Sequence, residues 1–177
     1  MTDIVQEGES VLREVAKEVP KSLFGTPELA SMLKTMQEAL ARAPHGVAIA
    51  GPQVAIPYRI FLVAHNRIDP KRAHEAEEAG AVEIGVYINP KITKRSRKKT
   101  PMSEGCLSVH GMFGTTMRHE RVTIEAYDEH GKKFSRGAGG VLAQAFQHEI
   151  DHLDGILFID HAKGLHELDL EDPDDTN

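Results

Sequence analysis

The stretch VLAQAFQHEIDHL, residues 141–153, decides the fold and holds the most specific chemical pattern in the chain. It is long and periodic enough for a helix, which should end near Gly155. On a helix, residues four apart lie on one face, so His148 and His152 can bind the same metal ion. Glu149 adjoins the first histidine, where its carboxylate can reach a water at that ion. The stretch predicts the metal-binding helix of a mononuclear hydrolase; the alternative is a charged helix face that holds two histidines by chance.

The rest of the chain predicts an α+β fold, with mostly antiparallel strands packed around this central metal-binding helix and another helix near the N-terminus. Thr26-Pro27-Glu28 starts the N-terminal helix, because it combines a capping hydroxyl, proline at the first helical position and an acid in the first turn. Apolar residues follow at helical spacing up to Leu40. Strands are expected at residues 59–64, 86–88, near 92, 121–127, 132–135 and 156–159.

Three segments are expected to lie outside these strands. Asn89-Pro90 is expected to separate the strand at 86–88 from the strand near 92. The segment from Gly137 to Gly140 is expected to end a hairpin. Residues 66–83 are charged and rich in alanine, which predicts a surface insertion between two strands, with a short helix around 74–79.

Length and composition restrict the chain to a few classes. Its 177 residues fit one domain, which we place at 1–165, followed by an acidic and flexible tail at 166–177. The net charge of -6 does not favour nucleic acid as a specific partner. The apolar runs are too short to cross a membrane, and the N-terminus has no signal-like core. One cysteine excludes an internal disulfide, so we expect a cytoplasmic protein.

Two histidines leave the proposed metal site short of a third protein ligand. A metzincin protease would need another histidine where this chain has Phe158. Cys106 is the remaining soft ligand, although a lone cysteine is commonly a small buried hydrophobe. The other candidates are acids of the tail and histidines without a surrounding motif: Glu167, Glu171, His161 and His166.

Three segments together resemble the signature of peptide deformylases. They are GVAIAGPQ at residues 46–53, EGCLS at 104–108 and QHEIDH at 147–152. They occur in the order of that family with comparable separations, and the likeness runs from about residue 4 to 159. The resemblance implies an enzyme that removes the formyl group from N-formylmethionine of nascent polypeptides.

The resemblance also implies the roles of individual residues. Cys106, His148 and His152 would bind the metal, with a water in the fourth position, and Glu149 would be the general base. The side-chain amide of Gln53 and the backbone N–H of Leu107 would stabilise the negative charge that develops on the formyl oxygen. The family implies Fe²⁺, with Zn²⁺, Ni²⁺ or Co²⁺ as alternatives, whereas the ligand types alone would favour zinc.

Further residues are expected around the substrate and behind the ligands. An apolar pocket for the methionine side chain should lie one turn before His148. Glu104 and Arg118 are expected to orient the ligands, with a surface arginine as the alternative for the latter. The residues expected to contact substrate are Val47, Ala48, Gly105, Val141, Gln144 and Ala145.

The chain departs from the usual family pattern at a few of these positions. Ala48 stands where the family usually has glycine, and its methyl group could narrow the cleft. Gln144 is polar where an aliphatic residue is usual, and could face the pocket or an adjacent side of the helix. His110 replaces a proline, and we expect it at the rim of the site.

The expected partners are N-formylmethionyl peptides and, transiently, the ribosome near its exit tunnel. The basic run KRSRKK at residues 94–99 could contact ribosomal RNA, but a solvated loop is the interpretation that we favour. Two other functions stay open: a zinc-dependent endopeptidase, and a catalytically weak deformylase-like binding protein.

Overall fold

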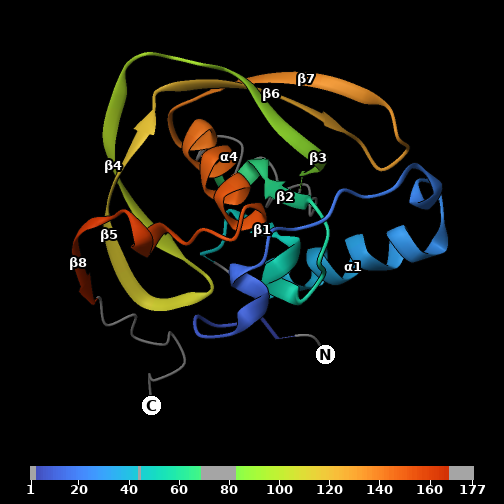
Figure 1. Cartoon of the computed structure of the whole chain (residues 1–177), viewed down its shortest axis with the longest axis horizontal. Helices are drawn as coiled ribbons and strands as arrows, with labels where there is room; N and C mark the ends of the chain where they lie inside the picture. Colours follow the sequence, from blue (N-terminus) through green and yellow to red (C-terminus); the bar gives the residue numbers. More distant parts are fainter. Residues whose placement is uncertain (1–2, 44, 69–82, 168–177) are drawn as a thin grey trace.

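A computed structural model describes residues 3–43, 45–68 and 83–167 of the chain. The larger of two antiparallel sheets has five strands in the order β1-β2-β3-β6-β7, and the smaller has the order β4-β5-β8 (Figure 1). The strands are β1 (Ala48–Ala50), β2 (Ile60–Ala64), β3 (Ile84–Arg95), β4 (Lys99–Cys106), β5 (Val109–His119), β6 (Arg121–Tyr127), β7 (Lys133–Gly139) and β8 (Lys163–Glu167). The helices are α1 (Pro27–Arg42), α2 (His65–Ile68), α4 (Gly140–Leu153) and the 3-10 turns η1 (Ser10–Arg13), η2 (Lys21–Leu23), η3 (Gly51–Val54) and η4 (Phe158–Asp160).

The N-terminal helix α1 starts where the sequence predicts. The Thr26 hydroxyl accepts a hydrogen bond from the Leu29 backbone N–H at 3.3 Å and so caps the first turn. The buried face of the helix comprises Leu29, Leu33, Met36, Ala39 and Leu40. These residues recur at intervals of three and four, so they form one apolar stripe that packs on the large sheet.

The large sheet is covered on both faces, and this explains why every residue of β2 is buried. Phe61 and Val63 point to one face and pack with residues of α4 such as Phe146. Ile60 and Leu62 point to the other face and pack with the stripe of α1. The alternation follows from the two-residue period of a strand. Helix α4 also contacts β5 of the small sheet, so it lies between the two sheets. The predicted α+β class is therefore confirmed.

Three local predictions were wrong. Asn89 and Pro90 do not separate two strands, because β3 continues through them with a shift of register against β6 between Ile88 and Lys91. Asn89 adopts a positive φ of 50°, and its side-chain amide pairs with the backbone of Val19, which stabilises this bulge.

The other two concern the ends of elements. β7 runs through Gly137 to Gly139, because its partner β6 supplies a continuous ladder. Residues 158–160 form the turn η4 instead of a strand, since the Asp160 carboxylate accepts a hydrogen bond from the Leu157 N–H at 2.9 Å and closes the turn. The strands β4 and β5 were not predicted at all.

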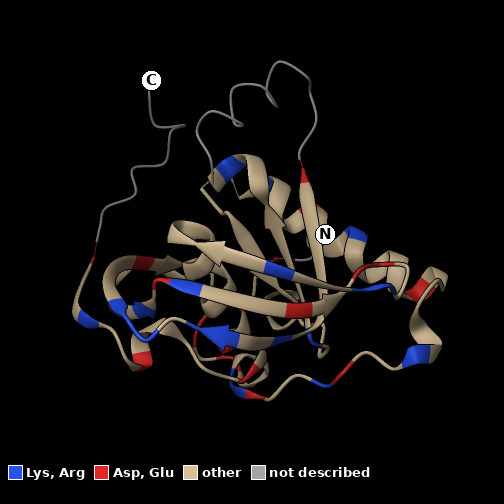
Figure 2. Cartoon of the chain, turned by 90° about the horizontal axis from the view of Figure 1, so that it is seen from above, with Lys and Arg blue, Asp and Glu red and all other residues tan. Residues whose placement is uncertain are grey.

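Some predicted features fall partly outside the described residues. The helix expected around 74–79 lies outside them, as does the tail beyond residue 167. His166 and Glu167, which we placed in the tail, pair with Phe113 and Met112 as part of β8. Within the described ranges, no helix combines the length and apolar character that a membrane span requires. Lys and Arg are interspersed with Asp and Glu over the elements visible in Figure 2.

Candidate metal centre

Helix α4 places both histidines of the predicted motif on one buried face. His152 is almost fully buried, and the two imidazole rings lie nearly perpendicular with their centroids 4.8 Å apart. The sequence spacing of four residues produces this arrangement, because one turn of helix brings such side chains together. Leu153 and Phe146, on the same helix, anchor it in the core beneath the site.

Cys106 reaches the histidines from the small sheet. It ends β4, and a two-residue turn leads into β5, where Val109 is its paired residue. The Cys106 Sγ atom lies 3.2 Å from His152 Nε2. One side-chain atom of each of the three residues lies within 4.8 Å of the others, and no other such group occurs among the residues that the structure describes. A thiol and two imidazoles at these distances could hold one divalent ion.

A network of buried charges holds His148 from behind. The Glu104 carboxylate accepts from His148 Nδ1 at 2.6 Å and from the Thr116 hydroxyl at 2.5 Å. Arg118 donates to both oxygens of Glu104, at 3.0 and 2.5 Å, and its third nitrogen binds Asp151 at 2.6 Å. Arg118 is therefore a buried residue of the site and not a surface arginine. The bond at Nδ1 leaves His148 Nε2 free to face Cys106.

This network controls the charge states around the two ligand positions. Burial alone would raise the pKa of Glu104, but hydrogen bonds from His148 and Arg118 outweigh it and keep the pKa below its usual range. Burial opposes the charged form of His148, yet its bonds to Cys106 and Glu104 raise its pKa. Burial and the nearby His148 lower the pKa of His152.

Glu149 lies beside the ligand group but bonds to none of it. Its carboxyl is almost fully buried, and Oε2 has no hydrogen-bond partner among the described residues. Burial raises the pKa of Glu149 to about 7, helped by Glu104 and Asp151 and opposed by His148. A carboxyl group with a pKa near neutrality can both take up and release a proton.

Two residues that line the cleft beside Cys106 carry hydrogen-bond donors. Gln53, in η3, is almost fully buried, and its Nε2 lies 3.6 Å from Cys106 Sγ and 3.1 Å from Ser108 Oγ. The backbone N–H of Leu107 makes no hydrogen bond to another described residue, although the Leu107 carbonyl accepts from Gln6. An amide and an unpaired N–H next to a metal site are suited to bind a developing negative charge.

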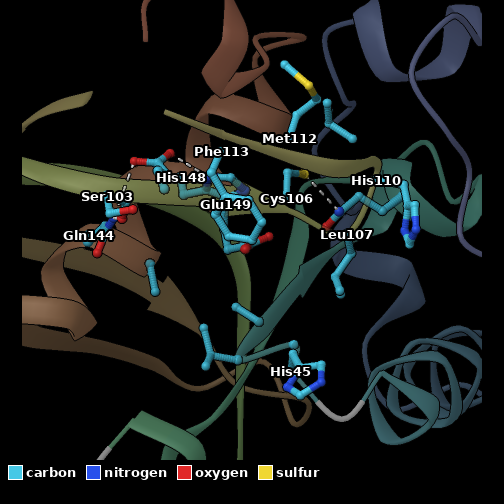
Figure 3. Close-up of a pocket in the computed structure, with 18 of the residues that line it drawn as sticks. His45, Ser103, Cys106, Leu107, His110, Met112, Phe113, Gln144, His148 and Glu149 are labelled. Carbon is cyan, nitrogen blue, oxygen red and sulfur yellow. Dashed lines mark hydrogen bonds and ion pairs between the residues drawn. The ribbon is translucent and has the colours of Figure 1, made fainter. Parts of the chain in front are cut away.

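A cleft with a volume of about 330 Å³ opens onto these groups (Figure 3). Leu107 and His110 lie on one side of it, Gln144 and Ser103 on the other, with Cys106, His148 and Glu149 between them. All six residues that we expected to contact substrate line this cleft: Val47, Ala48, Gly105, Val141, Gln144 and Ala145.

The structure also shows how the unusual residues are placed. Gln144 lines the cleft, but its Nε2 donates to the Ser103 carbonyl at 2.7 Å, so its amide is engaged with β4. His110 is exposed and lines the cleft without belonging to the ligand group. Ala48 is buried in the wall of the cleft.

Three residues of the site were missed by the sequence reasoning. Asp151 binds Arg118, Thr116 binds Glu104, and Ser108 accepts from Gln53. Asp151 could have been noticed, because it lies three residues after His148 on the same helix and close to its face. Thr116 offered no signal, since only the pairing of β4 with β5 brings it near Glu104.

Known proteins of one kind match the chain along most of its length. The sequence model of a family described as polypeptide deformylase matches residues 1–167. A peptide deformylase of Pelotomaculum thermopropionicum is 38% identical over 165 residues, which cover 93% of this chain and 94% of the relative. Peptide deformylase 1A, chloroplastic/mitochondrial, of Arabidopsis thaliana is 35% identical over 164 residues, but this chain spans only 61% of its length. A Met-Ala-Ser-bound crystal structure of a class I type b peptide deformylase from Acinetobacter baumannii aligns with a TM-score of 0.78 at 29% identity, over 89% of this chain and 96% of that one.

Proposed function

The chain belongs to the polypeptide deformylase family, and from this we propose that it hydrolyses the N-formyl group of N-formylmethionyl polypeptides and releases formate. One observation supports this most directly. The ligand atoms of Cys106, His148 and His152 lie within 4.8 Å of one another, beside a carboxylate oxygen of Glu149 that has no partner among the described residues. A three-ligand site with an adjacent base is the arrangement of catalytic rather than structural metal centres.

We propose that these three residues hold one divalent metal ion, which we take to be Fe²⁺ from the likeness to the family. The donor set fits such an ion, since thiolate and imidazole are ligands for first-row divalent metals, zinc included. When bound, the ion supplies a Lewis acid that lowers the pKa of water to about 7.

The residues of the chain then perform the proton and charge steps. Glu149 accepts the proton of the attacking water and later delivers it to the departing amine. Gln53 and the Leu107 N–H donate to the formyl oxygen as it becomes negative. The Glu104–Arg118 pair keeps His148 in one orientation through its Nδ1.

The cleft suggests how a peptide substrate lies. β1 and β4 are edge strands of their sheets, and both border the cleft. An extended peptide could therefore pass between Val47 and Ala48 on one side and Gly105 on the other. Val141 and Ala145 supply an apolar wall one turn before His148, which suits the methionine side chain.

We place the reaction in the cytoplasm, with transient contact to the ribosome near its exit tunnel, because the substrate is a nascent chain. The basic run 94–99 is largely exposed, and its Lys98 forms an ion pair with Glu120 at 2.7 Å. The predicted loop is shorter than the run, because Lys94 and Arg95 end β3 and Lys99 begins β4. We keep the run as a solvated surface segment and not as an RNA contact.

The test is anaerobic purification, metal analysis and incubation with formyl-Met-Ala-Ser or with the unformylated peptide. We expect formate from the first peptide and no internal cleavage of the second. Cleavage of internal peptide bonds would support an endopeptidase, and metal-loaded protein that releases no formate would refute the proposed activity.

A further inference from the structure

Arg67 binds three backbone carbonyl groups next to the cleft. Its Nη1 atom lies 3.0 Å from the carbonyl oxygen of Leu40, 2.8 Å from that of Ala43 and 2.7 Å from that of Gly46. Leu40 belongs to the last turn of α1, and Ala43 follows the end of that helix. The Leu40 carbonyl also accepts from the Ala43 N–H at 3.2 Å. Arg67 thus adds a charged donor at the C-terminal end of α1, where a cation is favoured.

The third carbonyl belongs to the wall of the cleft. Residues 45–48, which we call the wall segment, all line the cleft, whereas Arg67 does not. The Gly46 N–H donates to the Ala43 carbonyl at 2.9 Å, and the Val47 carbonyl accepts from the Ala64 N–H at 2.8 Å. Arg67 lies three residues after Ala64, in α2, so β2 and α2 hold the wall segment from one side.

The wall segment also packs against the residue that we propose as an oxyanion donor. Gly46 is buried, and a side chain there would come within 2.8 Å of Leu107 Cδ1 and 3.2 Å of Ala43 Cβ. The backbone of Gly46 thus lies directly under the Leu107 side chain. A shift of the wall segment would move one border of the cleft and remove support from Leu107.

We propose that Arg67 is a positioning residue of the active site, which fixes the wall segment against Leu107 through its three carbonyl bonds. This inference rests on the proposed function, because it concerns the placement of substrate in the same cleft. Arg67 does not line the cleft and has no bond to the three ligand candidates, so its effect passes through the Gly46 carbonyl and the wall segment. Small displacements of such supporting segments strongly reduce productive binding.

The test compares metal-loaded wild-type protein with Arg67→Met and Arg67→Lys. Methionine keeps much of the side-chain length but removes the donors, whereas a lysine ammonium has three donors on one nitrogen and can replace the bonds of Nη1. For formyl-Met-Ala-Ser we expect Arg67→Met to lower kcat/KM by about 10- to 100-fold, mostly through KM, and Arg67→Lys to recover most of it. Metal stoichiometry should equal that of the wild type.

Arg13→Met is the matched control, because Arg13 forms a surface ion pair with Asp160 at 2.6 Å and lies outside the cleft. Its kcat and KM should equal those of the wild type. Hydrogen exchange adds a readout that needs no substrate: backbone amides of residues 45–48 should exchange faster in Arg67→Met than in Arg13→Met.

Gly46→Ala probes the same contact without touching Arg67, and should raise KM by pushing Leu107 away. Unchanged KM in both Arg67→Met and Gly46→Ala would overturn the positioning role, and so would a loss of activity that simply follows loss of metal. If Arg67→Met does not fold, the KM values of Gly46→Ala and Arg67→Lys test the positioning role. Unchanged KM in Gly46→Ala would then overturn it. If wild-type protein releases no formate, the proposed function fails, and the exchange of residues 45–48 still tests the role of Arg67.

Discussion

The Gln53 Oε1 atom accepts a hydrogen bond from the Ala50 backbone N–H at 2.8 Å, and this bond orients the amide that we propose as an oxyanion donor. With Oε1 engaged, Nε2 must point toward Cys106 and Ser108. The donor end of the amide therefore faces the place where negative charge would develop, before any substrate binds. Such preorganisation is what makes a single donor effective.

Gln53→Glu should remove this donor while keeping the shape of the side chain. We expect kcat to fall by about 10²- to 10³-fold, because a carboxylate oxygen would face the developing charge. Metal content should stay stoichiometric, since Gln53 is not among the three ligand candidates. Gln37→Glu, an exposed change of the same kind on α1, should leave kcat unchanged. Kinetics with formyl-Met-Ala-Ser would measure kcat of both variants. A kcat of Gln53→Glu equal to that of the wild type would contradict the oxyanion role.

Glu149→Ala should remove the base and leave the metal. General acid–base groups contribute about 10²- to 10⁴-fold to a rate, so kcat should fall by that factor. The ligand atoms of Cys106, His148 and His152 are untouched, and elemental analysis should find about one ion per chain. Glu129→Ala, in the exposed β6–β7 turn, serves as the control. Wild-type turnover in Glu149→Ala would exclude the proposed base.

Cys106→Ala should lose stoichiometric metal. The thiol supplies the only ligand from the small sheet, and two histidines four residues apart cannot complete the site alone. Metal analysis after equilibration with one equivalent of Fe²⁺, Ni²⁺ or Zn²⁺ would measure the loss, and circular dichroism would check the fold. Undiminished binding would show that another residue supplies the third ligand.

Glu104→Gln should weaken both the site and the fold. His148 would lose the carboxylate on its Nδ1, and removal of such a partner typically costs about 10- to 100-fold in metal affinity. Arg118 would keep only Asp151, and breaking a buried pair costs about 3–5 kcal/mol of unfolding free energy. Chelator competition and urea denaturation measure the two effects. Glu125→Gln breaks an exposed pair with Lys133 and should change both quantities little.

Tyr87 should make the fold sensitive to strong alkali. Burial, against the opposing effect of Arg136, raises the pKa of Tyr87 to about 12, whereas an unfolded tyrosine titrates near 10. The folded state therefore keeps a proton that the unfolded state releases. This stabilisation, on the order of 2–3 kcal/mol, is present below pH 10 and is lost as pH rises to about 12.

Tyrosinate absorbance can follow this group, since the chain has three tyrosines and no tryptophan. Tyr87→Phe should lose the part of the tyrosinate absorbance that appears at the highest pH, which we call the late component. The urea midpoint of this variant should fall less steeply than that of the wild type between pH 10 and 12. Tyr58→Phe should keep the late component. A late component that survives in Tyr87→Phe would assign it to another group.

Local sequence signals predicted the parts of the fold and site that depend on neighbouring residues. The Thr26 cap and the apolar spacing behind it define α1, and the spacing of His148, Glu149 and His152 depends only on helical geometry. The strands β4 and β5 were missed because KTPMSEGC contains Pro and Gly and lacks a clear alternation. Their ladder forms through pairings that local propensity does not report.

The rest of the site depends on long-range contacts. Cys106 and His152 are 46 residues apart, and only the resemblance to a family could join them from sequence. The bonds of Thr116 and Ser108 depend on the register of the β4–β5 hairpin. The bulge at Asn89 depends on Val19, which lies 70 residues earlier. Such contacts follow from tertiary packing, which a single sequence does not specify locally.

The two-sided cover of β2 has a consequence for how the molecule opens. Neither α1 nor α4 can leave the large sheet without exposing a full row of β2, so these three elements should exchange their amide hydrogens only when the whole domain unfolds. The small sheet rests on a smaller cluster that includes Leu12, Val109 and Phe158. The two histidines thus belong to α4, in the part of the fold that should unfold last. Cys106 belongs to β4, in the small sheet, which should open more readily. Sub-global opening should therefore separate the thiol from the imidazoles first.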